Sequence, residues 1–167
     1  DYGIIGEGER AFCDLLAMLE TSSSPKKLYG PTLPYLSMDE VRASRELFDV
    51  KTHFSQGGSL KIPTKRGCPF HCSYCTYPTL EGKHIRQKSP VLVVDEIEQC
   101  QKEWGVDYFF FVDNVFNFPT EHAVGICDEL IRRKMDIRFT AYVSPAPLEE
   151  GTIAKFKEAG CSCIELG

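Results

Sequence analysis

Strand-like and helix-like segments alternate regularly after residue 58, and this order limits the folds that the chain can adopt. Four apolar stretches have the character of strands, and three segments with apolar residues at helical spacing lie between them. The expected strands are residues 59–67, 107–114, 137–144 and 161–166, and the expected helices are residues 89–104, 120–135 and 148–159. This order indicates repeated βα units and therefore an α/β fold with about four parallel strands joined by right-handed crossovers. Periodicity alone leaves open whether the sheet is open or part of a barrel.

The first expected strand leads directly into a cysteine-rich loop, RGCPFHCSYC, at residues 66–75. Its cysteines, Cys68, Cys72 and Cys75, have the spacing C-x3-C-x2-C, which is compact enough for one loop to surround a single inorganic centre. Soft thiolate ligands select zinc or iron–sulfur over hard cations. In parallel βα folds, ligands bind at the carboxyl ends of the strands, where the loops converge. The sequence therefore predicts a metal or cluster site at that edge.

The number of protein ligands distinguishes a zinc site from an iron–sulfur cluster. A structural zinc site usually has paired C-x2-C knuckles and a fourth cysteine or histidine that closes a tetrahedron. The sequence has no second knuckle, and His71, inside the loop, is more simply explained as a solvated side chain. A 4Fe-4S cluster held by three cysteines keeps one iron open to an outside molecule, and an open position is typical of catalytic metal sites. The pattern thus favours a catalytic iron–sulfur cluster.

The loop resembles the cluster motif of the radical S-adenosylmethionine (SAM) enzymes, in which an aromatic residue commonly precedes the third cysteine, as Tyr74 does here. The resemblance continues through the βα pattern from about residue 59 to the end. It implies that residues 59–167 form the N-terminal portion of a partial (β/α)6 TIM-like barrel. It also implies that the three cysteines hold a 4Fe-4S cluster and that the open iron binds SAM, so that the cosubstrate supplies the missing ligand.

The chemistry implied by this resemblance is reductive cleavage of SAM by an enzyme of the radical SAM, iron–sulfur type. The cluster passes one electron to the sulfonium, a carbon–sulfur bond breaks, and a deoxyadenosyl radical abstracts a hydrogen atom from the substrate. The outcome in the family is methyl transfer, cyclisation or a related reaction. The expected partners are a small-molecule or cofactor-like substrate and a one-electron donor of the flavodoxin or ferredoxin type. No side chain is singled out as catalytic.

Five residues are expected, by the same resemblance, to contact SAM. They are Tyr74, Asp113, Asn114, Ser144 and Glu165. The Tyr74 backbone would lie near the adenine, the Asp113–Asn114 pair near the methionine amino group, and Glu165 near the ribose hydroxyls. Polar residues that end an apolar strand are also common turn and cap formers, so this second interpretation stays open for Asp113 and Asn114. Glu165 is expected on an interior strand, where an acid is costly to bury without a partner.

Residues 1–20 resemble the last strand and helix of the cobalamin-binding-type domain that often precedes a radical SAM core, with GEGE as its turn. The apolar face of the expected helix consists of Phe12, Leu15, Leu16 and Leu19. Residues 21–58 contain several prolines and glycines and one short helical stretch, residues 39–48, and are expected to be a linker. Cobalamin is therefore an expected cofactor of the full-length protein.

A dinucleotide-binding turn is a competing interpretation of the same N-terminal segment. Gly6, Gly8 and Ala11 match a minimal G-x-G-x-x-A pattern. Glu7 and Glu9 would, however, repel a pyrophosphate at that helix N-terminus. We therefore favour the cobalamin-type interpretation.

Two further functions compete with the enzyme. The cysteine loop could belong to a structural zinc-binding or iron–sulfur electron-transfer module without catalysis, or to a redox sensor that forms reversible disulfides. The downstream segment with Lys83, Arg86 and Lys88 could pair with an anion, although a solvated basic face is the simpler explanation. Four cysteines of the later strands and helices, Cys100, Cys127, Cys161 and Cys163, are expected to be small core residues rather than ligands.

Composition excludes some classes of function. The formal net charge of −5 argues against a general nucleic-acid binder, because phosphate contacts need clustered lysine and arginine. No apolar run approaches the roughly 20 residues that cross a bilayer, and eight cysteines without an export signal indicate metal binding rather than disulfides. We expect a cytoplasmic protein. Strand-like stretches at both ends of the chain indicate a piece of a larger enzyme that binds its cosubstrate incompletely.

Overall fold

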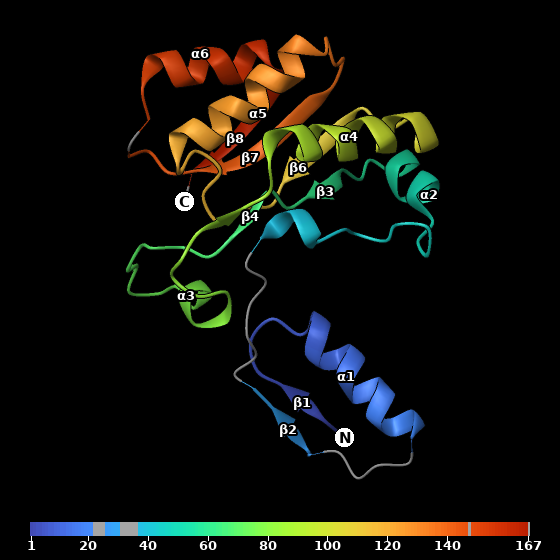
Figure 1. The fold of residues 1–167 in the computed structure, drawn as a ribbon. Helices are drawn as coiled ribbons and strands as arrows, with labels where there is room; N and C mark the ends of the chain where they lie inside the picture. The colour runs from blue at the N-terminus through green and yellow to red at the C-terminus, as the bar shows by residue number, and fades with distance from the viewer. Residues whose placement is uncertain (22–25, 31–36, 147, 167) are drawn as a thin grey trace. The chain divides into compact units, whose positions relative to one another are not determined.

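The computed structural model describes residues 1–21, 26–30, 37–146 and 148–166 of the chain (Figure 1). The elements are β1 (Gly3–Ile4), α1 (Glu9–Glu20), β2 (Leu28–Tyr29), the 3-10 helix η1 (Met38–Glu40), α2 (Val50–Ser55), β3 (Leu60–Ile62), β4 (Lys65–Arg66), α3 (Tyr77–Leu80), β5 (Arg86–Gln87), α4 (Pro90–Trp104), β6 (Tyr108–Phe111), α5 (Thr120–Arg132), β7 (Arg138–Val143), α6 (Glu150–Glu158) and β8 (Cys161–Leu166). They form two compact units, which are described separately. One unit comprises Asp1–Leu36 and Gly67–Ile85, and the other comprises Ser37–Arg66 and Arg86–Gly167.

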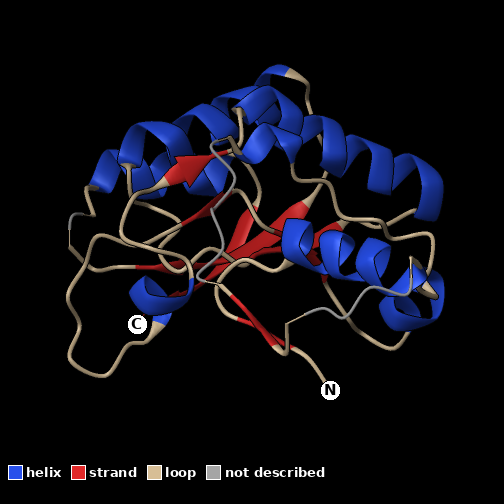
Figure 2. Ribbon diagram, turned by 60° about the horizontal axis from the view of Figure 1, so that its bottom comes forward, coloured by secondary structure: helices blue, strands red, loops and turns tan. Residues whose placement is uncertain are grey.

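The larger unit contains a four-stranded parallel sheet with the order β3-β6-β7-β8. Helices α4, α5 and α6 connect successive strands and form a layer on one face of the sheet (Figures 1 and 2). Such sequential βα units are the construction principle of βα barrels. The predicted α/β fold, with four parallel strands and three intervening helices, is confirmed.

The core of this unit lies between the sheet and its helices. Its largest fully buried side chains include Phe109, Phe111, Phe116 and Phe139, which come from β6, the loop after it and β7. The rings of Phe111 and Phe116 stack with centroids 4.6 Å apart, and Phe139 meets Phe111 edge-on at 5.0 Å. Alternate residues of each strand point to the same face, so the apolar positions of β6 and β7 face the helices together.

Helix α4 begins and ends where the sequence predicts. The Ser89 hydroxyl caps the N-terminus by accepting from the backbone N–H of Leu92, and Pro90 occupies the first turn. Gly105 ends the helix in the left-handed conformation, with φ of 70°. Val93, Ile97 and other apolar residues of this helix are buried against the sheet.

The other face of the sheet carries polar and aromatic side chains. Phe110 and Tyr142 lie with ring centroids 5.0 Å apart, and the Lys61 ammonium is 5.5 Å from the Phe110 ring centroid. The hydroxyls of Tyr108 and Thr140 are joined by a hydrogen bond of 2.7 Å between β6 and β7. These contacts hold neighbouring strands together on the face that lies away from the helices.

Residues 37–58 differ from the expected linker. They belong to the same compact unit as the sheet, where Met38 and Val50 are buried. The helix expected at residues 39–48 is wrong, because only η1 at its start is helical and α2 begins two residues after its end. Arg45 explains the difference, since its guanidinium donates to the Lys61 carbonyl (2.9 Å) and pairs with Glu96 of α4 (2.5 Å). Segments 22–25 and 31–36 of the expected linker lie outside the described residues.

The smaller unit begins with a βαβ element. Strands β1 and β2 are parallel neighbours, and α1 connects them. Strand β2 was not expected, because it lies within the segment interpreted as a linker. Of the predicted apolar face of α1, Leu15 is buried, but Phe12, Leu16 and Leu19 are exposed. Two strands of two residues each offer too little surface to cover that face.

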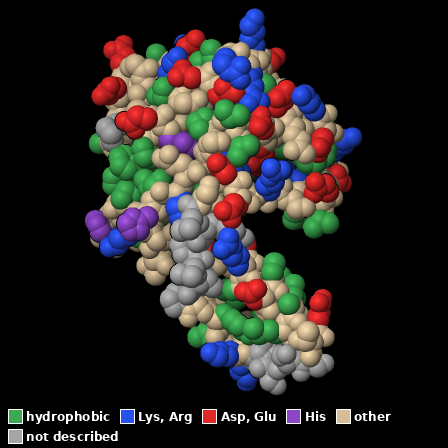
Figure 3. All heavy atoms as spheres, in the orientation of Figure 1, with side chains coloured by type: hydrophobic (Ala, Val, Ile, Leu, Met, Phe, Trp, Pro, Cys, Tyr) green, Lys and Arg blue, Asp and Glu red, His purple; other side chains and the backbone are tan. Residues whose placement is uncertain are grey.

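Charges of both signs are interspersed on the face of the larger unit seen in Figure 3. Lysine and arginine alternate with aspartate and glutamate there, so this face has no single-sign patch of the kind that attracts nucleic acid. Within the described ranges, none of the helices has the length and apolar character needed to cross a membrane.

Candidate functional site

The cysteine loop is closed at its base by a short antiparallel ladder. Strand β4 precedes the loop and β5 follows it, and the two pair with Lys65 opposite Gln87 and Arg66 opposite Arg86. Further bonds lie just inside this ladder: the Cys68 N–H donates to the Gly82 carbonyl (3.1 Å), and the Gly67 N–H donates to the Glu81 carboxylate (3.2 Å). The two ends of the loop therefore lie side by side, at the β4–β5 pair.

Gly67 is required by this closure. Its φ is 89°, which side-chain-bearing residues rarely adopt, and a Cβ built on it would collide with the His84 carbonyl oxygen. The returning segment of the loop, at His84, thus packs against the backbone at Gly67. The close approach of the His84 carbonyl therefore explains why a glycine precedes the first cysteine.

The three thiols lie on this one loop but are not gathered around a common point. Cys68 is buried, Cys75 is half-buried and Cys72 is exposed, while a turn joins the Cys75 N–H to the Cys72 carbonyl (3.1 Å). Across the described part of the chain, no three His, Cys, Asp or Glu side chains are grouped closely enough to hold a metal ion. The assignment of Cys68, Cys72 and Cys75 as ligands of one centre therefore stays a prediction. Metal-binding side chains often take up their final arrangement only when the metal binds. A cluster that bonds all three sulfurs would therefore bring these thiols together.

The donor set itself fits an iron–sulfur cluster. Iron–sulfur clusters are held by cysteine thiolates. The loop supplies three thiols within residues 68–75, and its neighbouring His71 and Tyr74 are both exposed. Tyr74, whose backbone is predicted to lie near the adenine of SAM, is 81% exposed, so its ring has no role in the packing of this loop.

Asp113 lies at the carboxyl end of β6, as predicted, but its side chain is directed into the protein. It is 2% exposed, and its Oδ1 accepts hydrogen bonds from the backbone N–H groups of Thr64 (2.8 Å) and Lys65 (3.1 Å). Its Oδ2 accepts from the Thr64 hydroxyl (2.5 Å) and lies 3.5 Å from Lys65 Nζ. Both carboxylate oxygens are therefore engaged by the chain itself. Asn114 is half-buried beside it.

Ser144 directly follows β7 and is held by Asn117, which was not among the residues predicted for the site. The Asn117 amide donates to the Ser144 carbonyl and accepts from the Ser144 N–H, both at 2.9 Å. The Ser144 hydroxyl donates to the Ala146 carbonyl (2.8 Å). Asn117 is completely buried, and the only signal for it in the sequence was an amide within the loop VFNF after an apolar strand.

Glu165 lies on β8, at the outer position of the described sheet, opposite Tyr142 of β7. Its side chain is exposed in the described part of the chain. Of the described strands, only β7 pairs with β8, and whether Glu165 lies on an interior strand of the complete sheet stays a prediction.

The basic segment after the loop is not one continuous face. Lys83 is exposed, whereas Lys88 is buried and pairs with Glu96 of α4 (2.7 Å). Arg86 is half-buried in β5. Glu96 thus joins Lys88 to Arg45, which places Lys88 in the packing of α4 rather than on an anion-binding surface.

The remaining strand and helix cysteines are separate from the loop. Cys100 and Cys127 are buried in the core, where burial raises their pKa values to about 11 and about 12. Burial also raises the pKa of half-buried Cys161 to about 11. Thiols that resist ionisation are poor nucleophiles and ligands. Cys163 is exposed, so the expectation that it is a core residue is wrong. The pairing of β7 with β8 is irregular at this place, because Phe139 lies opposite Cys161 and the next residue, Thr140, lies opposite Cys163.

Comparison with known proteins identifies the family. The sequence profile of the "Radical SAM superfamily" matches residues 62–167, which is more than half of the chain. The chain is 29% identical to a tryptophan 2-C-methyltransferase of Streptomyces laurentii over 145 residues, covering 81% of this chain and 23% of that protein. It is 30% identical to an anaerobic magnesium-protoporphyrin IX monomethyl ester cyclase of Cereibacter sphaeroides over 192 residues, covering 100% of this chain and 31% of that protein.

A solved structure has the same fold. The radical S-adenosylmethionine methyltransferase TsrM from Kitasatospora setae, with cobalamin and a [4Fe-4S] cluster bound, superposes with a TM-score of 0.81 at 22% identity, covering 100% of this chain and 37% of that one. The sequential parallel strands and their single layer of helices therefore define a protein of the partial βα-barrel class. The chain belongs to the Radical SAM superfamily. It spans about a quarter to two fifths of the length of these relatives.

Proposed function

We propose that the chain binds a [4Fe-4S] cluster through Cys68, Cys72 and Cys75 and cleaves SAM reductively to start radical chemistry. The observation that carries this proposal is the closed cysteine loop in a chain whose residues 62–167 match the Radical SAM superfamily. These three thiolates would hold the cluster, which when bound would supply the one-electron reduction of the SAM sulfonium. The catalytically silent zinc module is less well supported, because the family of the chain uses this cluster.

The chain's own residues would shape the cosubstrate site. The backbone at Tyr74, the strand-end residues Asn114 and Ser144, and the exposed carboxylate of Glu165 remain the proposed SAM contacts. Asp113 was also expected to contact SAM, but its oxygens are engaged by Thr64 and Lys65. We therefore do not retain Asp113 as a cosubstrate ligand.

The reaction of the whole protein is proposed from its relatives. A methyltransferase and a cyclase are both among them, and we propose methyl transfer or cyclisation on a small-molecule substrate, with a flavodoxin- or ferredoxin-type electron donor. Residues 1–20 would be the end of a cobalamin-binding-type domain and residues 59–167 the first part of the radical SAM core. The parallel β1-α1-β2 element supports the first of these assignments. A cytoplasmic location, which keeps the thiols reduced, is part of the proposal.

A SAM-cleavage assay tests the proposed function. The protein is reconstituted with iron and sulfide without oxygen, reduced with dithionite, and assayed for deoxyadenosine or a methylated product by mass spectrometry. The expected result is cleavage of SAM by the wild type and background levels for Cys72→Ser. Cys13→Ser is the matched control, because Cys13 is also exposed but lies in α1. Equal activity of Cys72→Ser and wild type would contradict the assignment of ligands.

A further inference from the structure

The buried group at Asp113 joins two distant parts of the sequence. Asp113 follows β6, and its partner Thr64 lies 49 positions earlier, directly before β4. Thr64 is completely buried, and its N–H, its hydroxyl and the N–H of Lys65 all donate to the Asp113 carboxylate. A carboxylate that accepts three hydrogen bonds holds its partners in one defined geometry.

The charge of this group is balanced inside the protein. The Lys65 ammonium is 3.5 Å from Asp113 Oδ2 and donates to the Phe116 carbonyl at 2.8 Å, and the Lys65 side chain is 4% exposed. A buried carboxylate without such a partner would be strongly destabilising. Because Phe116 belongs to the loop after β6, the lysine links the start of β4 to the same loop that carries Asp113.

The group also fixes the returning end of the cysteine loop. The Thr64 carbonyl accepts from the Lys88 N–H at 2.8 Å, directly after β5. Both backbone polar groups of Thr64 are therefore hydrogen-bonded: its N–H donates to Asp113, and its carbonyl accepts from Lys88, the residue after β5. Only two residues, Arg66 and Gly67, lie between Lys65 and Cys68 in the sequence.

We propose that Asp113 is a positioning residue for the cysteine loop, which fixes the backbone from which Cys68 departs, and is not a ligand of the cosubstrate. This inference rests on the proposed function, because positioning matters only if the loop holds a cluster. Outer residues that orient ligand-bearing segments typically change metal affinity by about 10- to 100-fold when they are replaced.

Three variants and one control test the inference. Thr64→Val removes the hydroxyl that bonds Asp113, Thr64→Ser restores it, and Asp113→Asn removes the charge that faces Lys65. Thr140→Val is the matched control, because Thr140 is also a buried threonine with a side-chain hydrogen bond but lies on β7, away from the loop stems. If Asp113→Asn does not fold, the threonine series still decides the question.

Two measurements are made on these proteins. Hydrogen–deuterium exchange of the cluster-free protein reports the loop directly: residues 64–75 should exchange faster in Thr64→Val and Asp113→Asn than in wild type, Thr64→Ser and Thr140→Val. After reconstitution, the first two variants should lose iron to a chelator about tenfold faster than the control. Exchange and iron loss that match those of Thr140→Val would overturn the inference. If the wild type itself takes up no iron, the proposed function fails, whereas the exchange measurement still decides whether Asp113 anchors the loop.

Discussion

At the scale of single residues, two glycines of the cysteine loop give a sharp contrast. Gly67 and Gly82 both have positive φ, 89° and 82°, but a Cβ at Gly67 would strike the His84 carbonyl, whereas a Cβ at Gly82 would meet nothing within 4 Å. Gly82→Ala should therefore cost only the conformational penalty, about 1–2 kcal/mol. Gly67→Ala should in addition open the base of the loop.

Iron content after reconstitution and urea denaturation check this pair. We expect Gly82→Ala to bind iron as the wild type does and to unfold at slightly lower urea. Gly67→Ala should bind much less iron. Equal iron binding by the two variants would show that the close approach at Gly67 is not needed to form the site.

Sequence could not reveal the role of Asp113 at this scale. A polar residue after the apolar stretch YFFFV predicts either a ligand contact or a turn, and local pattern does not choose between them. What distinguishes the two is the hydrogen bond of Asp113 to Thr64, a residue 49 positions earlier in the sequence. The cysteine spacing, by contrast, is local, and so the loop was recognised from the sequence alone.

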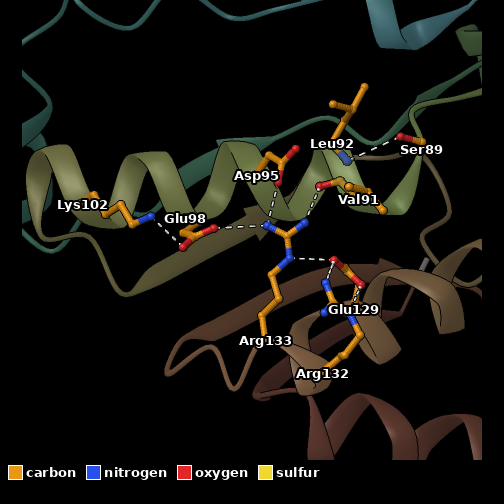
Figure 4. Close-up of polar contacts among 9 residues, drawn as sticks. All are labelled: Ser89, Val91, Leu92, Asp95, Glu98, Lys102, Glu129, Arg132 and Arg133. Carbon is orange, nitrogen blue, oxygen red and sulfur yellow. Dashed lines mark hydrogen bonds and ion pairs between the residues drawn. The ribbon is translucent and has the colours of Figure 1, made fainter.

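At the scale of secondary-structure elements, a network of charged side chains joins α4 to α5 (Figure 4). Arg133, just after α5, bonds Asp95 (2.6 Å), Glu98 (3.1 Å) and Glu129 (2.6 Å). Arg132 also bonds Glu129, at 2.7 Å. Side chains of two neighbouring helices thus meet at one guanidinium, which suits the planar, multiply donating arginine.

This network predicts a pH dependence of stability. Hydrogen bonds from Arg132 and Arg133 lower the pKa of Glu129 from an ordinary value of 4.5 to about 2. As the pH falls, the unfolded state takes up this proton first, so the stabilisation by Glu129 is complete above about pH 5 and is lost between about pH 5 and pH 2. Urea denaturation should therefore show a larger difference between wild type and Glu129→Gln at about pH 6 than at about pH 3.

Glu121→Gln is the control for this measurement. Glu121 is an exposed residue in the first turn of the same helix. Its replacement should leave the pH dependence close to that of the wild type. A constant difference between wild type and Glu129→Gln at both pH values would contradict the ionic origin of the contact.

Replacing phenylalanine by alanine on the two faces of β6 should destabilise the protein to different extents. Phe111 is fully buried against Phe116 and Phe139 on the helix-covered face, whereas Phe110 is half-buried on the other face. Phe111→Ala should lower the free energy of unfolding by about 3–5 kcal/mol, as expected for a large cavity in a core. Phe110→Ala should cost clearly less, and the free energies of unfolding of the two variants, from urea denaturation, would show it.

At the scale of the whole molecule, the sequence predicted the repeated βα units well and residues 37–58 poorly. The strands and helices after residue 58 are encoded by local periodicity and by caps such as Ser89 and Gly105. The path of residues 37–58 depends instead on distant contacts, because Arg45 reaches Lys61 and Glu96. Local pattern carries no information about such contacts.

The arrangement of the three thiols in space also cannot be predicted from the local sequence pattern. The spacing of Cys68, Cys72 and Cys75 indicated a shared centre, and the structure shows a closed loop whose thiols differ in burial. Their proposed convergence depends on a centre that binds all three sulfurs. The cluster is therefore the part of the account on which the function of the molecule depends.

Electron paramagnetic resonance of the anaerobically reconstituted and reduced protein, recorded before and after addition of SAM, tests that claim most directly. We expect about four irons per chain, the signal of a reduced [4Fe-4S] cluster, and a change of that signal when SAM binds the open iron. A protein that retains zinc in place of iron, or a cluster whose signal does not respond to SAM, would contradict it.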